Sequence, residues 1–229
     1  ETFGIDEAAV AIARADGGTG FDWSARLLQA DGGEFVVLHR GREVGTVRWS
    51  LLGRHNVMNA LAALAAAHAV GVEPAQVIAA LAGFASVKRR LEVLGTQSGV
   101  TVYDDFAHHP TAIATTLEGL RAKVGDARIL VAMEPRSNSM RLGAHADALA
   151  PSLALADAVV FLHRPELAWD AGAVIAAVRG QALAVADTDA LLAALHAQAR
   201  PGDHVVFMSN GGFDGAPRRF LALLGATGA

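Results

Sequence analysis

The chain has 229 residues, 52% of them hydrophobic, which is enough to bury one large domain or two smaller ones. Its net charge of -4 and pI near 6.1 argue against a nucleic-acid partner or an acidic membrane surface, because both favour a basic face. The absence of cysteine excludes disulfides and thiolate metal sites. No stretch has the length of a membrane span or the pattern of a signal peptide. We therefore expect a soluble cytoplasmic protein.

The first part of the chain is predicted to contain β-hairpins followed by two helices. Turns of the hairpin type, at 31–33 and 41–42, separate three expected strands at 22–30, 34–40 and 43–50. Apolar residues then recur at helical spacing from Gly53 to Gly71, and a second helix is expected from Pro74 to about Gly83. Three hairpin-like strands need a sheet to join, so we expect the chain to begin within a domain.

After about residue 88 the pattern changes to an alternation of strands and helices. Strands are expected at 100–103, 129–133, 158–162, 182–185 and 204–208. Helices are expected at 111–123, 144–154, 171–179, 189–199 and 217–224. This alternation predicts βαβ units and an α/β fold with a mostly parallel sheet, whose ligands bind beyond the carboxyl ends of the strands.

Polar side chains cluster at the start of the first helix. His55 and Asn59 are four residues apart and share a face, and Asn56 lies one turn before Asn59. Two asparagines so early in a helix indicate capping or ligand contact, since asparagine is a mediocre helix former. The amide of Asn59 could offer a donor and an acceptor to a purine edge. Ordinary N-capping by Asn56 is the plainer interpretation.

Two charged segments come next along the chain. The basic run at 88–90 could be a solvated face, or one arginine could contact a phosphate in a cleft between the two regions. The segment 102–111 ends a strand with Asp104 and Asp105 and then carries His108 and His109. A carboxylate at a strand end can accept hydrogen bonds from a ribose, whereas histidines beside carboxylates could bind a metal or act as acid and base. A loop histidine that bonds the backbone is the plain alternative.

Two later loops also follow predicted strands. The loop 134–141 has two arginines and suits a carboxylate-rich small molecule, or is a solvated polar loop. The segment 209–213 could expose backbone N–H groups to an anion, or be a plain turn. The two lysines, Lys88 and Lys123, do not lie in a G-x-x-x-x-G-K-[ST] loop, so the chain has no P-loop. It also lacks the glycine fingerprint of a Rossmann-type dehydrogenase.

Together these motifs resemble the Mur ligase family of ATP-dependent amide-forming enzymes. The segments that carry the resemblance are 53–59, 87–92, 103–111, 134–138 and 208–213. Within the family they are most similar to the branch that joins UDP-N-acetylmuramate to the recycled tripeptide L-alanyl-γ-D-glutamyl-meso-diaminopimelate. The branch that adds L-alanine shares the motif at 104–111 but differs in the loop 134–138, and it is the alternative. A second alternative is a non-catalytic module that binds nucleotide or peptide.

The resemblance implies a division into two domains. Residues 1–87 would be the end of a central ATP-binding domain without its P-loop half, and residues 88–229 a complete C-terminal Rossmann-like domain. The UDP-sugar domain, the P-loop and the main Mg²⁺ ligands would lie outside the chain, which alone is expected to be inactive. The implied role is cell-wall recycling, and through it cell shape and division.

The family's reaction, as the resemblance implies it, begins with attack of the muramate carboxylate on the γ-phosphate of ATP. The amine of the peptide then attacks the acyl phosphate, and positioning and charge neutralisation dominate such catalysis. Residues implied to bind the nucleotide are His55, Asn56, Asn59, Arg90 and Asp105, with Arg90 on the phosphates and Asp105 on the ribose. Residues implied at the reaction centre and on the tripeptide are His108, Arg136, Ser137 and Asn138. The resemblance implies no metal ligand within the chain.

Overall fold

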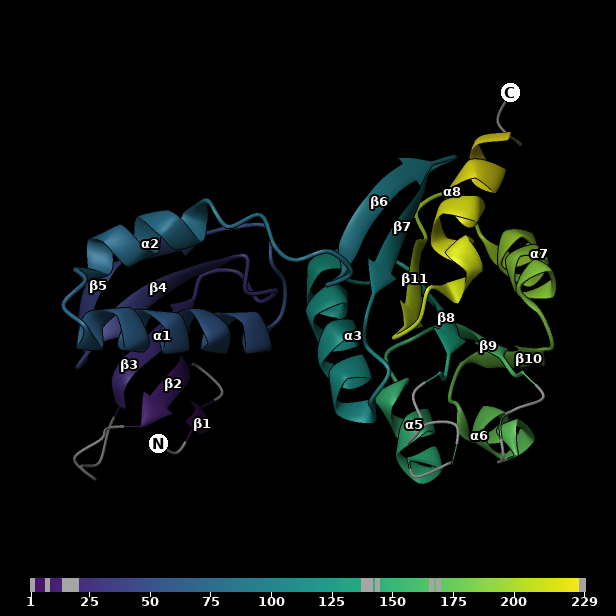
Figure 1. Ribbon diagram of the computed structural model, residues 1–229, viewed down its shortest axis with the longest axis horizontal. Coiled ribbons are helices and arrows are strands. Elements are labelled where there is room, and N and C mark those ends of the chain that lie inside the picture. Colours follow the sequence, from purple (N-terminus) through teal and green to yellow (C-terminus); the bar gives the residue numbers. More distant parts are fainter. Residues whose placement is uncertain are drawn as a thin grey trace. The chain divides into compact units, whose positions relative to one another are not determined.

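The chain forms two compact units, Glu1–Ser86 and Val87–Ala229, and each is described by itself (Figure 1). The computed structural model describes residues 3–6, 9–13, 21–136, 142, 145–164, 167 and 170–226, the first two segments as backbone only.

The first unit is an antiparallel sheet with two helices packed against it. The strands pair in chain order: β1 (Phe3–Asp6), β2 (Ala9–Ala13), β3 (Phe21–Leu27), β4 (Glu34–His39) and β5 (Arg42–Arg48). The helices are α1 (Arg54–Ala69) and α2 (Pro74–Ala82). Alternate strand residues meet one side of each helix in a core that includes Trp23, Phe35, Val47, Leu61 and Ile78. The three predicted strands and both helices are confirmed, while β1 and β2 were not predicted.

The turn between β3 and β4 also holds the start of α1. The carbonyl of Asp31 accepts a hydrogen bond from the Gly53 amide at 2.7 Å, and its carboxylate accepts one from the Gly33 amide at 2.8 Å. Gly32 has a φ of 80°, and a Cβ there would lie 3.1 Å from the side chain of Val57. The predicted hairpin turn therefore fixes the position of the helix that carries His55.

The second unit is a six-stranded sheet in the order β10-β9-β8-β11-β7-β6. Its strands are β6 (Glu92–Gln97), β7 (Val100–Asp105), β8 (Ile129–Glu134), β9 (Ala158–Leu162), β10 (Gln181–Val185) and β11 (His204–Ser209). All neighbouring pairs are parallel except β6 and β7, which are antiparallel. The predicted α/β fold with a mostly parallel sheet is confirmed, and β6 is an addition that the sequence pattern did not predict.

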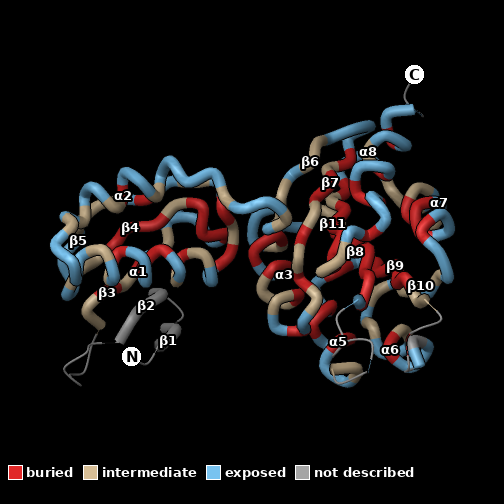
Figure 2. Tube along the Cα trace, in the orientation of Figure 1, coloured by how far each residue is buried: buried red, intermediate tan, exposed pale blue. Residues whose placement is uncertain are grey.

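Helices cover both faces of this sheet. On one face lie α3 (Pro110–Val124), α5 (Ala146–Ser152) and α6 (Ala171–Ala177), and on the other lie α7 (Thr188–Gln198) and α8 (Ala216–Ala226). Alternate residues of β8 divide between the two layers, because Val131 packs toward α3 whereas Leu130 packs toward α7 and α8. Figure 2 shows the buried residues concentrated along the central strands. None of the helices in the described ranges is long and apolar enough to cross a membrane.

The strand order brings three loops together at one edge of the sheet. The chain passes from β7 through α3 to β8, and β11 later fills the place between them. Met208 of β11 pairs with Asp105 on one side and Met133 on the other, and Ser209 pairs with Glu134. The loops that follow β7, β8 and β11 therefore meet at the carboxyl edge, where open α/β sheets bind ligands.

Candidate functional site

A continuous chain of polar contacts runs along the carboxyl edge of the second sheet. This edge network consists of Asp104, Arg89, Ser209, Glu134, Arg164, Asp214 and Thr188. Arg89 begins it, donating from Nε to Asp104 Oδ1 at 3.3 Å and from Nη2 to the carbonyl of Ser209 at 2.6 Å. The network thus links the segment before β6 to the loop after β11.

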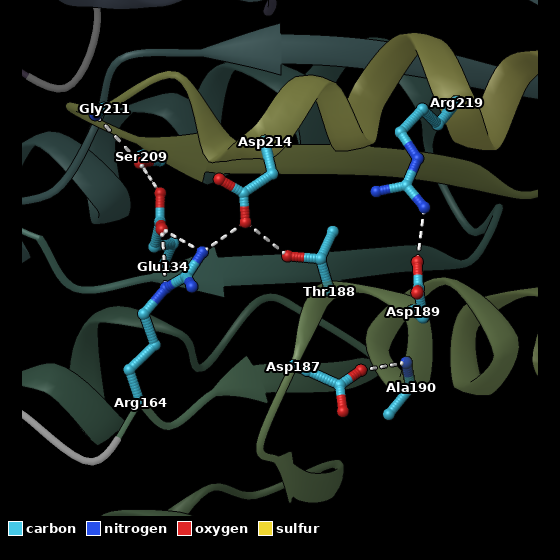
Figure 3. Close-up of polar contacts among 10 residues, drawn as sticks. All are labelled: Glu134, Arg164, Asp187, Thr188, Asp189, Ala190, Ser209, Gly211, Asp214 and Arg219. Carbon is cyan, nitrogen blue, oxygen red and sulfur yellow. Dashed lines mark hydrogen bonds and ion pairs between the residues drawn. The ribbon is translucent and has the colours of Figure 1, made fainter.

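Glu134 is the buried centre of the edge network (Figure 3). Only 2% of it is exposed, and Ser209 donates to its Oε2 at 2.6 Å. Arg164 donates to its Oε1 from Nε at 3.3 Å and from Nη2 at 3.2 Å. A carboxylate this deep needs such partners, because a buried charge without them is strongly unfavourable.

Asp214 completes the edge network from a strained turn. Its Oδ2 accepts from Arg164 Nη2 at 2.5 Å and from Thr188 Oγ1 at 2.8 Å (Figure 3). These two hydrogen bonds lower the pKa of Asp214, and the hydrogen bond with Asp214 raises the pKa of Arg164. Phe213 and Asp214 have φ values of 47° and 49° in the short 3₁₀ turn η1 (Phe213–Gly215). The contacts of Asp214 help to hold a backbone conformation that L-residues rarely adopt.

A pocket of about 260 Å³ opens beside the edge network. It is lined by Glu134, Pro135, Arg136, Leu162, Arg164, Leu167 and Asp214. Arg136 is exposed and forms no hydrogen bond or ion pair with another residue that the structure describes. A Cβ on Gly211 would lie 2.3 Å from its Cδ, so Gly211 leaves room for the arginine side chain. The predicted peptide-binding residues Ser137 and Asn138 lie outside the described residues.

The two histidines after β7 have different partners. His108 Nδ1 lies 2.9 Å from the carbonyl of Phe106, which can only accept, so Nδ1 carries the proton and Nε2 is the acceptor of the neutral ring. His109 is the N-cap of α3, where its Nδ1 accepts from the Thr111 amide at 3.4 Å. Within the described ranges no three His, Cys, Asp or Glu side chains are grouped to hold a metal ion.

Asp105 faces inward at the end of β7. It is 3% exposed, and its carboxylate accepts from the amides of Leu91 at 2.6 Å and Ala107 at 2.7 Å. Burial raises the pKa of Asp105, and these two hydrogen bonds lower it in part. The predicted ribose contact stays a prediction. Arg90 is exposed, and its Cζ lies 5.4 Å from the centroid of the Phe106 ring.

The predicted adenine-binding residues lie at the start of α1 in the first unit. His55 and Asn59 are both exposed and share the helix face opposite the core, as their spacing predicted. Asn56 is half-buried and donates from Nδ2 to the carbonyl of Leu52 at 2.7 Å. Gly53 occupies the N-cap position with a φ of 90°, so the capping interpretation of Asn56 is wrong.

Sequence reasoning missed Arg164, Thr188 and Asp214. Arg164 comes two residues after β9 and Thr188 three residues after β10, while Asp214 lies in the turn that follows β11. The usable signal was their place after parallel strands, since polar side chains there reach the same edge of the sheet. None of the three belongs to a local motif.

Comparisons with known proteins show which family the sequence resembles. The family described as "Mur ligase, glutamate ligase domain" matches residues 89–211. The UDP-N-acetylmuramate–L-alanyl-γ-D-glutamyl-meso-2,6-diaminoheptandioate ligase of Escherichia coli (strain K12) is 49% identical over 200 residues, covering 87% of this chain and 44% of that protein. The UDP-N-acetylmuramate–L-alanine ligase of Mycobacterium sp. (strain JLS) is 40% identical over 174 residues, covering 72% of this chain and 36% of that protein.

The solved structures agree with the sequence comparisons. The crystal structure of a murein peptide ligase from Psychrobacter arcticus 273-4 is 42% identical, with a TM-score of 0.67 over 90% of this chain and 45% of that one. The chain therefore spans less than half the length of these relatives.

Proposed function

The chain belongs to the Mur ligase family, and we propose that it contributes the peptide-binding and part of the nucleotide-binding surface of an ATP-dependent amide ligase. The proposed reaction joins UDP-N-acetylmuramate to L-alanyl-γ-D-glutamyl-meso-diaminopimelate in the cytoplasmic recycling of cell-wall peptide. The higher identity to the E. coli tripeptide ligase, 49% against 40% for the mycobacterial alanine ligase, supports the tripeptide as the acceptor.

The observation that carries the proposal is the pocket around Arg136. Its guanidinium offers a planar fork of donors that suits a carboxylate, and it forms no hydrogen bond or ion pair with a described residue, although its charge helps to lower the pKa of Asp214 in the same pocket. Arg164 is bonded to both Glu134 and Asp214, so with Arg136 the lining holds two carboxylates and two guanidinium groups and has no net formal charge. Leu162 and Leu167 supply apolar walls for the aliphatic parts of a peptide. The carboxylate-rich tripeptide fits this combination better than free alanine, which has a single carboxylate.

In the proposed reaction a muramate carboxylate oxygen attacks the γ-phosphorus of ATP, and ADP leaves. The peptide amine then attacks the acyl carbon, phosphate leaves, and the nitrogen loses a proton. Arg90 would stabilise the charge on the phosphates. His108 would accept the proton, since its Nε2 is the acceptor of the neutral ring. Asn59, with His55 and Asn56, would bind the adenine.

The triphosphate and its Mg²⁺ need groups that this sequence lacks. It contains no P-loop, so we propose that this chain alone does not turn over ATP. Turnover of ATP coupled to amide formation by the 229-residue chain would contradict this part of the proposal.

The test uses the full-length ligase that contains this chain, supplied with ATP, Mg²⁺, UDP-N-acetylmuramate and either the tripeptide or L-alanine. Phosphate release and the mass of the product measure ligation. We expect a higher kcat/KM for the tripeptide, and a KM for it about tenfold higher in Arg136→Ala, as loss of one charge-assisted contact predicts. Arg219→Ala, which removes an exposed arginine that pairs with Asp189 on the surface, is the matched control. Faster use of L-alanine would favour the alanine-adding branch instead.

A further inference from the structure

Two histidines occupy the last positions of two core-facing stripes in the first unit. The stripe of α1 that buries Leu61 and Leu64 continues at helical spacing to His68, in the last turn of the helix. On β4 the core residue Val37 is followed at the next inward position by His39. An apolar side chain would suit both positions, and neither histidine takes part in the proposed ligase chemistry.

Both histidines contact Trp23, a residue of β3 that pairs with His39 across the sheet. The ring of His39 stacks on Trp23, with centroids 4.3 Å apart and planes 16° from parallel. The ring of His68 meets Trp23 edge to face at 5.4 Å and His39 edge to face at 5.0 Å. Only 4% of Trp23 is exposed. These three residues, which we call the ring cluster, therefore join the sheet to the last turn of α1.

The surroundings of His39 disfavour a positive charge on its imidazole. The ionisable groups that face it are His68 from α1, Asp22 from β3, Arg40 from the turn after β4, and Arg42, its partner on β5. The neighbouring elements β2 and α2 contain no ionisable residue. Burial, followed by the charges of His68 and Arg40, lowers the pKa of His39, and Asp22 raises it by less. Asp22 is itself paired with Arg40 at 3.1 Å.

We propose that the ring cluster is an acid-released latch, which holds the last turn of α1 against the sheet while its imidazoles are neutral and releases that turn when His39 and His68 take up protons. The inference does not depend on the proposed ligase activity, because it concerns packing within the first unit alone. The first turn of α1 has a separate anchor, the hydrogen bond from the Gly53 amide to the Asp31 carbonyl. Release is therefore confined to the end of the helix.

Proton linkage gives the direction and the size of the effect. A released His39 takes up a proton at the ordinary pKa of 6.5, whereas the latched ring resists it, so the latch weakens as the pH falls through 6.5. One pH unit below that value, the released ring is protonated about ten times more often than not. The population of the released state should therefore rise by up to about tenfold between about pH 7.5 and about pH 5.5.

The first experiment measures hydrogen exchange along α1 in the 229-residue chain at these two pH values. Exchange is expressed as protection factors, which remove the intrinsic pH dependence of amide exchange. We expect the protection of the amides at 66–69 to fall by about three- to tenfold in acid, while that of the amides at 58–61 changes less than about twofold. Unchanged protection at 66–69, or an equal loss along the whole helix, would overturn the proposal.

Three variants locate the titrating group. His39→Phe keeps a flat ring against Trp23 but cannot take up a proton, so the end of α1 should stay protected in acid. His68→Gln removes the second charge and should reduce the acid loss. His55→Gln is the matched control, because it removes a histidine from the exposed face of the same helix and should leave the acid loss as it is in the unchanged chain. An acid loss in His39→Phe as large as in the unchanged chain would contradict the latch.

A second measurement follows the imidazole of His39 directly, by nuclear magnetic resonance during a pH titration. We expect its midpoint to lie below 6.5, to rise in His68→Gln because a neighbouring cation is lost, and to fall in Asp22→Asn because a neighbouring anion is lost. A midpoint at the ordinary value, or one that His68→Gln does not move, would show that the two rings are not coupled and would refute the proposal even if the helix end exchanged faster in acid.

Discussion

Replacing Arg164 by methionine tests whether the edge network stabilises the second unit. The change removes the guanidinium but keeps a side chain of similar length. Glu134 is 2% exposed, and its Oε1 receives both of its hydrogen bonds from Arg164. Its Oε2 keeps the bond from Ser209. The variant therefore leaves a buried carboxylate with one oxygen unpaired.

The size of the loss follows from this geometry. Breaking a buried ion pair costs about 3 to 5 kcal/mol, and a buried unpaired polar group about 1 to 3 kcal/mol. Because 36% of the Arg164 side chain is exposed, water can replace part of what is lost, so we expect about 2 kcal/mol. Arg219→Met is the matched control. Arg219 and Asp189 are 47% and 83% exposed, and the loss there should stay within about 0.5 kcal/mol.

The assay must report on the second unit. The two described tryptophans, Trp23 and Trp49, lie in the first unit, so their fluorescence would follow the other part of the chain. Native-state hydrogen exchange of amides in β8 and β11 measures the free energy of opening of the correct sheet. Adding Glu134→Gln to Arg164→Met should recover about 1 kcal/mol, because a buried amide costs less than a buried charge. Equal losses in Arg164→Met and Arg219→Met, or no recovery in the double variant, would refute the reasoning.

Three further predictions concern other parts of the chain. In the full-length ligase, the methyl group of Gly211→Ala should displace the side chain of Arg136 and raise the KM for the tripeptide about tenfold, without changing the KM for ATP. In a variant that already carries Arg136→Ala, Gly211→Ala should not raise the KM for the tripeptide any further. Burial raises the pKa of Tyr103 to about 12 from its ordinary value of 10.0. As the pH rises, the phenol of the unfolded chain therefore loses its proton before the phenol of the folded chain does, and the free energy of unfolding decreases between these two pKa values. In denaturant titrations at high pH, Tyr103→Phe should not show this decrease of about 2 kcal/mol in the free energy of unfolding. An equal decrease in the variant and in the unchanged protein would contradict the prediction. His109→Asn should be more stable than His109→Ala by up to about 1 kcal/mol, because asparagine is the better N-cap; equal exchange rates of the first amides of α3 in the two variants would argue otherwise.

Much of the fold could be predicted because its signals are local. The strands and helices after residue 100 follow the apolar periodicity, and β9 has the predicted bounds. The strand β6 gives no such signal. It begins with Glu92, carries Gly95 at a φ of 154° and has a register shift beside that glycine. An exposed edge strand with a bulge does not need the alternation that a buried face imposes.

The candidate site was predicted only where its residues lie in one segment. The motifs at 53–59, 103–111 and 134–138 are each contiguous, and they led to His55, His108 and Arg136. Arg164 and Asp214 meet because β9 lies beside β8 and because β11 returns to the centre of the sheet before the turn that carries Asp214. Their place after parallel strands puts both residues at the same edge of the sheet, but periodicity does not predict the order of the strands, so the sequence did not show that the two side chains meet.

Asp104 and Asp105 show that a motif in the sequence does not determine the surroundings of each of its residues. Successive strand residues point to opposite faces, so the two carboxylates of one motif had to have different surroundings. The sequence could not say which of them turns inward, since both faces of this sheet are covered by helices. In the structure Asp105 points toward Thr116 on α3, and Asp104 pairs with Arg89 on the other face. A motif can therefore be recognised as a whole while the roles of its members depend on the elements packed over each face.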